Sequence, residues 1–267
     1  MTQLAKRSLA VVIVALAATA VIAAAAAAPA RHAGGTLRFC SDITYPPEEF
    51  YVGTKPAGSD IDIGNEVAKR MDKTAKFDNT GFDGIIAALL AKKCDAIISG
   101  MNDTPERRKQ VDFVDYIKVG QSLMVKSGNP KHITGLASLS GKTVSVEVGT
   151  TNKTFLDAQS KKLTAAGKAA IKVQAFPKDT DAAAALKTGR VDAYFGDAPV
   201  VAYYVSRDKS FAFAGTPVNP IPVGIAVRKS DTTLKSGIQK AINGMYADGT
   251  MKRILAKWKM SATALKK

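Results

Sequence analysis

The stretch GFDGIIAALLAKKCDAIISGMNDTPERRKQVDF, residues 81–113, decides the fold class. Its first part, 82–91, has apolar residues at helical spacing, and a basic turn then leads to 96–99, a short apolar run typical of a buried strand. A similar acid, helix, basic turn and strand recur at 181–196. One such match could arise by chance, but a true repeat implies two similar α/β lobes rather than one sheet.

Strands separated by helices continue along the chain and predict βαβ units with parallel sheets. Further strands are expected at 36–40, 143–147, 171–175 and 193–195, and further helices at 61–71, 151–165 and 181–187. Two extended stretches, 116–126 and 217–228, lack helical periodicity, and we interpret them as crossings of the chain between the lobes. Because ligands of open α/β sheets bind at the carboxyl ends of strands, a cleft between the lobes is the expected site.

The first 30 residues have the pattern of a secretory signal peptide. Lys6 and Arg7 precede an uncharged, mostly apolar run from 8 to 30 that ends in Ala28-Pro29-Ala30. We expect cleavage near Ala30 and a periplasmic mature protein. An uncleaved membrane anchor is the alternative, since about 20 apolar residues can span a bilayer.

Composition and charge limit the function. The chain has 267 residues, and the 46% that are hydrophobic exclude a disordered protein and allow a sizeable core. Its net charge is +15, and removal of Lys6 and Arg7 with the signal peptide takes it to +13. The basic residues are scattered, without the aromatic interleaving of nucleic-acid binders, so no nucleic-acid partner is expected. We interpret the charge as the solvated coat of an exported protein.

The few histidines and cysteines argue against catalysis and metal binding. The chain contains two histidines, His32 and His132, so neither a catalytic triad nor a metal site is expected, and no cofactor is predicted. Cys40 ends the first strand, whereas Cys94 precedes 96–99. If these strands are parallel neighbours, five residues of strand rise separate the sulfur atoms by roughly 15 Å, which is too far for a disulfide. We therefore predict two free, buried thiols.

Five groups of polar or aromatic residues lie after strands or at helix starts, where one cleft can collect them. In 99–107, Thr104-Pro105 predicts a helix start, and Arg107 lies in the first turn, where the helix dipole disfavours a cation. An anionic ligand is one explanation, and a solvated arginine or an internal ion pair is the other. At 147–152, free N–H groups near Thr151 suit a carboxylate, although a simple helix cap by Thr150 or Thr151 is the alternative.

The other three groups also have two interpretations each. Asp197 follows an apolar strand and is either a helix N-cap or a carboxylate that faces an ammonium group. The segment SDITYPPEEF, 41–50, carries acids and an aromatic after the first strand, or it is a solvated turn. Phe82 opens a helix and is either core or a stacking surface.

The chain resembles the extracytoplasmic amino-acid-binding proteins of ABC importers, solute-binding protein family 3. The resemblance rests on these segments, in this order: TLRFCSDITYPPEEF, GSDIDIGNEVAKRM, the stretch 81–113, SVEVGTTNKTFL, GRVDAYFGDAPVVAYYV and YADGTMKRILAKW. It covers 36–260 and implies an α/β, two-lobed periplasmic-binding-protein fold of type II, the flytrap, with two crossing hinge strands. Lobe 1 would comprise 36–119 and 223–267, lobe 2 would comprise 124–217, and the hinge crossings would lie at about 120–123 and 218–222.

The resemblance also implies roles for ten residues. Arg107 matches the arginine that binds the ligand α-carboxylate, and a planar guanidinium suits that bidentate contact. The backbone N–H of Thr151, beside Thr150, would complete the carboxylate site, and Asp197 would receive the α-ammonium group. The remaining contacts would come from the carbonyl of Gly100, the side chain of Asn102, the aromatic pair Tyr45 and Phe82, and Asp42 and Ser99 near the ligand side chain.

Two departures from the family pattern concern the ligand. Asn102 stands where serine or threonine is usual, and Glu48 stands where an aromatic is common, which would add negative charge near the cleft mouth. Together with Asp42, these residues favour a ligand with a cationic or polar side chain, such as arginine, lysine, ornithine, histidine or glutamine. Asp42 also occurs in relatives with uncharged ligands, so the amino acid itself stays open.

The implied function is capture of a free amino acid by a monomer that delivers it to the membrane permease of an ABC transporter. Reporting to a sensor kinase instead of a permease is equally compatible with the chain. An enzyme resembling periplasmic cyclohexadienyl or arogenate dehydratases is the main rival, with Glu48 or Glu147 as the acid that protonates a leaving hydroxyl. The complete amino-acid clamp would have no function in such an enzyme, so we expect a binding protein.

Overall fold

The computed structural model describes residues 34–265, so the predicted signal peptide and its cleavage site lie outside the described residues. One eight-stranded sheet organises this part of the chain, in the order β4-β1-β5-β10-β6-β9-β7-β8. None of the helices found in this range is both long and apolar enough to cross a membrane.

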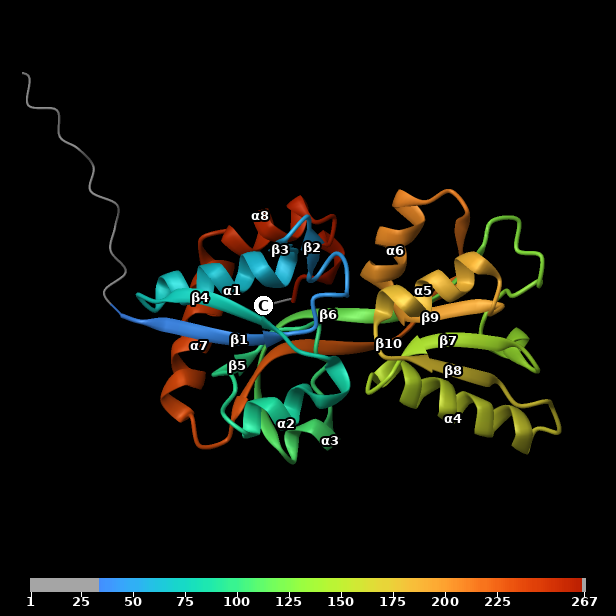
Figure 1. The fold of residues 1–267 in the computed structure, drawn as a ribbon, viewed down its shortest axis with the longest axis horizontal. Coiled ribbons are helices and arrows are strands. Elements are labelled where there is room, and N and C mark those ends of the chain that lie inside the picture. The colour runs from blue at the N-terminus through green and yellow to red at the C-terminus, as the bar shows by residue number, and fades with distance from the viewer. Residues whose placement is uncertain (1–33, 266–267) are drawn as a thin grey trace, which may run out of the picture. The chain divides into compact units, whose positions relative to one another are not determined.

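The strands and helices alternate along the chain, as expected for an α/β fold (Figure 1). The strands are β1 (Thr36–Ser41), β2 (Phe50–Val52), β3 (Lys55–Ala57), β4 (Thr74–Asn79), β5 (Ala96–Ile97), β6 (Val111–Lys126), β7 (Thr143–Glu147), β8 (Lys172–Phe176), β9 (Ala193–Asp197) and β10 (Phe211–Arg228). The α-helices are α1 (Ser59–Arg70), α2 (Ile85–Leu90), α3 (Pro105–Arg108), α4 (Thr151–Ala165), α5 (Asp179–Thr188), α6 (Ala198–Arg207), α7 (Thr232–Ala247) and α8 (Thr250–Lys257). Short 3₁₀ turns occupy Phe82–Gly84, Leu136–Leu139 and Ser261–Thr263.

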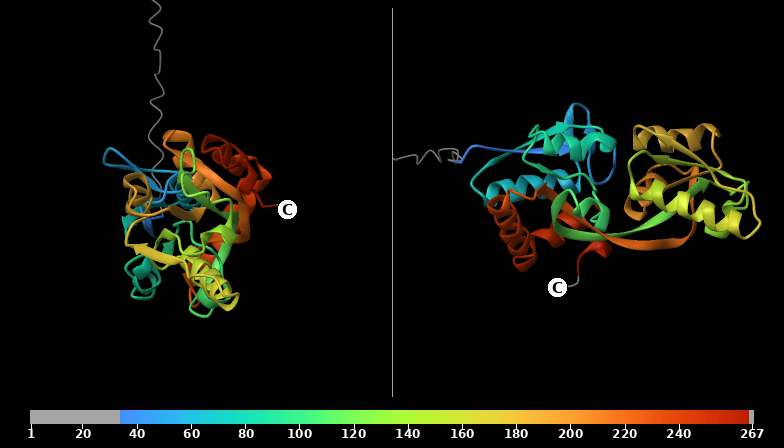
Figure 2. Two further views of the ribbon diagram at one scale, coloured as in Figure 1. Left: turned by 90° about the vertical axis from the view of Figure 1, so that its right-hand side faces the viewer. Right: turned by 90° about the horizontal axis from the view of Figure 1, so that it is seen from below.

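Two long strands, β6 and β10, connect the two halves of this sheet. They pair with each other in antiparallel fashion, and the right-hand view of Figure 2 shows them running side by side. At one end Ala226 of β10 pairs with Ile97, and at the other Gln121 of β6 pairs with Asp197. The two crossing strands confirm the expected two-lobed architecture. The hydrogen-bonded sheet is nevertheless continuous, because strands of 16 and 18 residues are long enough to serve both lobes.

Each lobe has helices on both faces of its part of the sheet. In the first lobe, Leu37 and Phe39 pack with apolar residues of α1, α7 and α8, whereas Cys40 and Ile97 point to the opposite face, which α2 covers. The C-terminal helices therefore belong to the first lobe. In the second lobe, α5 and α6 cover one face and α4 covers the other. The numbered limits of the lobes stay a prediction.

Local sequence patterns account for most element positions. Apolar side chains of α1 recur at the spacing of a helix face, and Ile61, Ile63, Val67 and Ala68 are all buried. The strand 143–147 and the helix 151–165 have the predicted bounds, while the other predicted elements differ from the observed ones by a few residues at their ends. The hairpin β2–β3 and strand β4 were not predicted.

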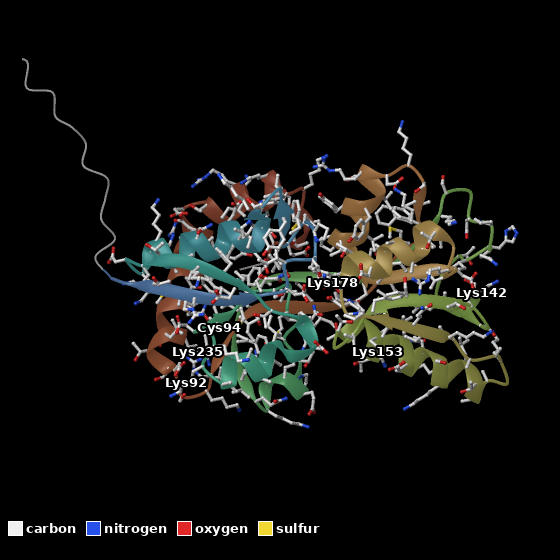
Figure 3. All side chains as sticks on the ribbon, in the orientation of Figure 1. Lys92, Cys94, Lys142, Lys153, Lys178 and Lys235 are labelled. Atoms are coloured by element: carbon white, nitrogen blue, oxygen red, sulfur yellow. A yellow bond between two sulfur atoms is a disulfide. The ribbon has the colours of Figure 1, made fainter. Side chains whose placement is uncertain are left out.

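The prediction of two free thiols is wrong, because Cys40 and Cys94 form a disulfide whose Cα atoms are 5.6 Å apart. The parallel pairing of β1 and β5 is as expected, with Phe39 opposite Ala96. Residues 91–95, however, form a turn and not an extension of β5. This turn brings Cys94, labelled in Figure 3, to the cluster under α2 in which Cys40 also lies. In the register of β1 and β5, Cys40 lies opposite Ile97, only three residues from Cys94, so five residues of strand rise overestimate the separation.

We expect the double variant Cys40→Ser/Cys94→Ser to be less stable than the oxidised protein by up to about 4 kcal/mol. The crosslink spans 54 residues of sequence and so restricts the unfolded chain. Urea unfolding measures the difference, and reduced wild-type protein serves as a matched control that should behave like the variant. Two titratable thiols in the oxidised protein after denaturation would contradict the disulfide.

Candidate ligand-binding site

Residues from both lobes line a small, nearly closed cavity of about 10 Å³ at the carboxyl ends of β1, β5, β7 and β9. Its lining consists of Asp42, Tyr45, Phe82, Ser99, Gly100, Asn102, Glu147, Thr150, Asn152 and Asp197. The structure therefore brings together eight of the ten residues that the sequence singled out. The other two, Arg107 and Thr151, contact residues of this lining directly.

Arg107 lies in the first turn of α3, beside the cavity. Thr104 caps this helix, as predicted, because its hydroxyl oxygen accepts a hydrogen bond from the backbone N–H of Arg107 at 3.2 Å. The guanidinium donates to the carbonyl oxygens of Asn102 at 2.8 Å and Gly149 at 3.1 Å, and its central carbon lies 5.2 Å from the centre of the Phe82 ring. Burial lowers the pKa of Arg107 to about 10, so it stays charged at neutral pH. Both of these hydrogen-bond acceptors are neutral groups.

The start of α4 supplies Thr150 and Thr151. Thr150 is the N-cap of the helix, since its hydroxyl oxygen accepts from the backbone N–H of Lys153 at 3.2 Å. The cap interpretation of Thr150 is therefore confirmed. The hydroxyl of Thr151 donates to the side-chain oxygen of Asn102, which joins the second lobe to the first.

Tyr45 crosses from the first lobe into the second. Its ring is 6% exposed and packs with Tyr194 and Val200 in the core of the second lobe. The backbone N–H of Asp197 donates to its hydroxyl oxygen at 3.2 Å. A Cβ atom at Gly100 would lie 3.1 Å from the Tyr45 ring, and the φ of Gly100 is +49°, so glycine allows the close approach. Tyr45 therefore helps to hold the lobes together as well as lining the cavity.

Asp42 is buried, and both of its carboxylate oxygens accept hydrogen bonds within the first lobe. One accepts from the hydroxyl of Thr44 at 2.7 Å and the other from the backbone N–H of Phe82 at 2.8 Å. Its own N–H donates to the hydroxyl oxygen of Ser99 at 2.8 Å. Burial raises the pKa of Asp42, while these hydrogen bonds and the charge of Lys178 lower it. Asp42 thus fixes where Phe82 stands.

Asp197 occupies the N-cap position of α6, but its side chain makes no capping hydrogen bond. The residue is 2% exposed, and its Oδ1 has no hydrogen-bond partner within residues 34–265. Burial raises its pKa to about 7, against the effect of hydrogen bonds from Asn152 and Tyr45 and the charge of Arg107. A cation beside this carboxyl group would favour its ionised form.

Two lining residues, Glu147 and Asn152, were missing from the set expected to contact the ligand. Glu147 is the last residue of β7, where topology directs a side chain to the cleft, and this position was the signal that could have identified it. Asn152 follows Thr151 in α4, and its amide nitrogen lies 3.5 Å from the Tyr45 hydroxyl. Burial raises the pKa of Glu147 well above its usual range, and three neighbouring carboxyl groups add to the effect.

Glu48 does not lie at the cleft mouth, which corrects the expectation from sequence. It is 1% exposed and belongs with Glu49 and Asp60 to a buried acidic group behind the cavity. Asp60 accepts hydrogen bonds from the backbone N–H of Gly100 at 2.8 Å and from the Tyr116 hydroxyl at 2.7 Å. This group holds the loop after β5 in place, and burial raises the pKa of all three of its carboxyls.

Most of the chain is similar to known solute-binding proteins. The model of the bacterial extracellular solute-binding proteins, family 3, matches residues 37–261. ABC transporter arginine-binding protein 1 of Escherichia coli (strain K12) is 31% identical over 233 residues, which cover 85% of this chain and 91% of that protein.

Two solved structures share the fold. An ancestral arginine-binding protein bound to arginine is 39% identical, with a TM-score of 0.77, and the match covers 84% of this chain and 98% of that one. The ancestral amino acid-binding protein AncCDT-1, a precursor of cyclohexadienyl dehydratase, is 33% identical, with a TM-score of 0.77 and coverage of 84% and 95%.

The raised pKa of Asp197 predicts that the ligand-free protein loses stability as pH rises. A carboxyl with a pKa of about 7 in the folded state and 3.8 as its ordinary value binds its proton more tightly when folded. Its contribution is therefore complete at low pH and is lost as pH rises through 7. Between about pH 5 and pH 7.5, this residue alone accounts for roughly 2 to 3 kcal/mol.

The variant Asp197→Asn removes this titration, so its free energy of unfolding should fall less steeply with pH than that of the wild type. Urea unfolding of ligand-free protein across this range measures the slope. Asp208→Asn is the control, because the pKa of Asp208 is lowered to about 2 and the residue does not titrate there. Equal slopes for wild type and Asp197→Asn would contradict the prediction.

Proposed function

This chain belongs to the bacterial extracellular solute-binding proteins, family 3, and we propose that it captures a free amino acid between its two lobes and delivers it to the permease of an ABC importer. The relatives named above are binding proteins, which supports binding rather than catalysis as its activity. We also propose that the signal peptide is cleaved near Ala30 and that the mature protein acts as a monomer in the periplasm.

One observation carries the proposal: a partly buried guanidinium and a buried carboxyl group lie beside the same cavity but come from different lobes. Arg107 donates to neutral carbonyl groups only, and Asp197 has an oxygen without a partner among the described residues. The α-carboxylate and α-ammonium of an amino acid complement these two groups. A zwitterion that leaves water needs both of its charges paired, and the two lobes together provide the partners.

The other residues of the cavity fit contacts around this pair. The backbone N–H of Thr151 is at the start of α4, where a carboxylate is favoured. Gly100 and Asn102 follow β5 and would contact the ligand backbone. Tyr45 and Phe82 both line the cavity and would pack against the ligand side chain. Closure is then a population shift toward the state in which both lobes contact the ligand.

The charge of the cavity favours an amino acid with a cationic side chain. Asp42, Glu147 and Asp197 line it, whereas Arg107 is the single guanidinium that contacts it in the described chain. A ligand with a net positive charge, such as arginine, lysine or ornithine, reduces this excess of acidic over basic groups. A neutral zwitterion does not. The named arginine-binding relatives support the same class.

A dehydratase on the same fold is the second candidate. A buried glutamate whose pKa is raised well above its usual range, such as Glu147, is a candidate general acid. The likeness to AncCDT-1 also points in this direction, although that protein binds amino acids. We favour binding because the Arg107 and Asp197 pair fits an amino acid, and turnover of prephenate or arogenate by the purified protein would reverse this choice.

Substitution of Arg107 tests the proposed site. We expect Arg107→Ala to weaken arginine binding by about 100-fold or more, since two charge-assisted hydrogen bonds to the ligand carboxylate would be lost. Isothermal titration calorimetry measures the affinity. The matched control is Arg108→Ala, because Arg108 is the next residue, is exposed and pairs with Asp103, and neither residue lines the cavity.

The control variant should bind arginine within a few-fold of the wild type. Unchanged thermal unfolding of both variants without ligand shows that they are folded. Micromolar binding retained by Arg107→Ala would refute the proposed carboxylate site.

A further inference from the structure

One carboxyl group of the cavity, that of Glu147, has no part in the contacts proposed for the ligand's α-carboxylate and α-ammonium groups. It is 3% exposed and lines the cavity. Its Oε1 has no hydrogen-bond partner in the part of the chain that the structure describes. A buried carboxylate oxygen without a donor is costly, so its presence in a binding cavity calls for a partner that arrives from outside.

We propose that Glu147 pairs with the cationic end of the ligand side chain, and that this residue selects a guanidinium or ammonium group over a neutral one. The inference rests on the proposed amino-acid-binding function and assigns its specificity to a residue of the second lobe.

Asp42 is the competing candidate, but its carboxylate is already used. Its two oxygens accept from the Thr44 hydroxyl and from the backbone N–H of Phe82. Ser99, its neighbour, donates its hydroxyl to Glu49 at 2.9 Å. These bonds fix the loop after β1 and the aromatic ring of Phe82. We therefore assign Asp42 a positioning role, and the direct pairing to Glu147.

The backbone around Glu147 is held firmly, which suits a residue that must discriminate between ligands. Its carbonyl oxygen accepts from the Thr150 hydroxyl at 2.8 Å, and the N–H of Val148 donates to the carbonyl oxygen of Phe176 at 2.9 Å. The backbone on both sides of the carboxyl group is thus fixed, while its Oε1 stays available for a partner from outside.

Glu147 forms no salt bridge within residues 34–265. The strongest charge effects on its carboxyl group come from Asp179, Asp42 and Asp197, all of which are acidic. Lys178, labelled in Figure 3, is exposed, and its charge acts on Asp42. A cationic ligand end would supply the missing positive charge where the cavity is most acidic.

The test compares arginine with citrulline, which has the same length and shape but a neutral urea group in place of the guanidinium. We expect Glu147→Gln to weaken arginine binding by about 100-fold, because a buried charge pair is broken. Citrulline affinity should change by less than about 3-fold, since glutamine keeps the size of the side chain and can hydrogen-bond to a neutral urea group. Calorimetry on the folded, full-length mature protein gives both affinities.

Asp42→Asn is measured in parallel and should weaken arginine and citrulline in similar proportion, as a positioning role requires. Loss of the arginine preference in Asp42→Asn, with the preference kept in Glu147→Gln, would overturn the inference. An equal loss of both ligands in Glu147→Gln would also overturn it, because it would show that Glu147 only maintains the shape of the cavity. Binding of no amino acid by wild-type protein would instead refute the proposed function itself.

Discussion

The electrostatics of the cleft are set by carboxyl groups that are buried with few cations beside them. Asp42, Glu147 and Asp197 line the cavity, and Glu48 and Glu49 lie behind it. An ionised carboxylate in such an interior costs several kcal/mol unless it is paired. The protein offsets part of this cost through backbone donors and through raised pKa values that favour the protonated forms. What remains is an attraction for positive charge at the cavity between the lobes.

The contacts that close the lobes are made by the same residues that would contact the ligand. Arg107 reaches the carbonyl of Gly149, and Tyr45 accepts from the backbone of Asp197. A Cβ atom at Gly149 would lie 2.8 Å from the Cα of Asp83, and its φ is +77°, so glycine lets the lobes approach here. Closure and recognition are therefore one event in energetic terms, because a ligand gains its full set of partners only when the lobes meet.

Sequence alone could predict features that depend on local or topological rules. The caps at Thr104 and Thr150 follow from residue type and position, and Asp197 was placed at the cleft because it ends a strand. Local rules could not predict features that depend on the path of a turn. Cys94 reaches Cys40 because residues 91–95 do not continue a strand, and Glu48 turns inward although its neighbours in sequence suggested an exposed loop. Both depend on tertiary packing that no short pattern encodes.

The net charge of +15 and the acidic cavity also show why recognition must be local. Figure 3 shows Lys92 and Lys142 at the outer sides of the two lobes, far from the strand ends that form the cavity. A cationic ligand is repelled by such a coat at long range, but salt at physiological concentration screens exposed charges beyond about 8 Å. The buried carboxylates act at contact distance, where screening is weak. Selectivity for a cation is therefore compatible with a basic protein, provided that a carboxyl group such as Glu147 meets the ligand directly.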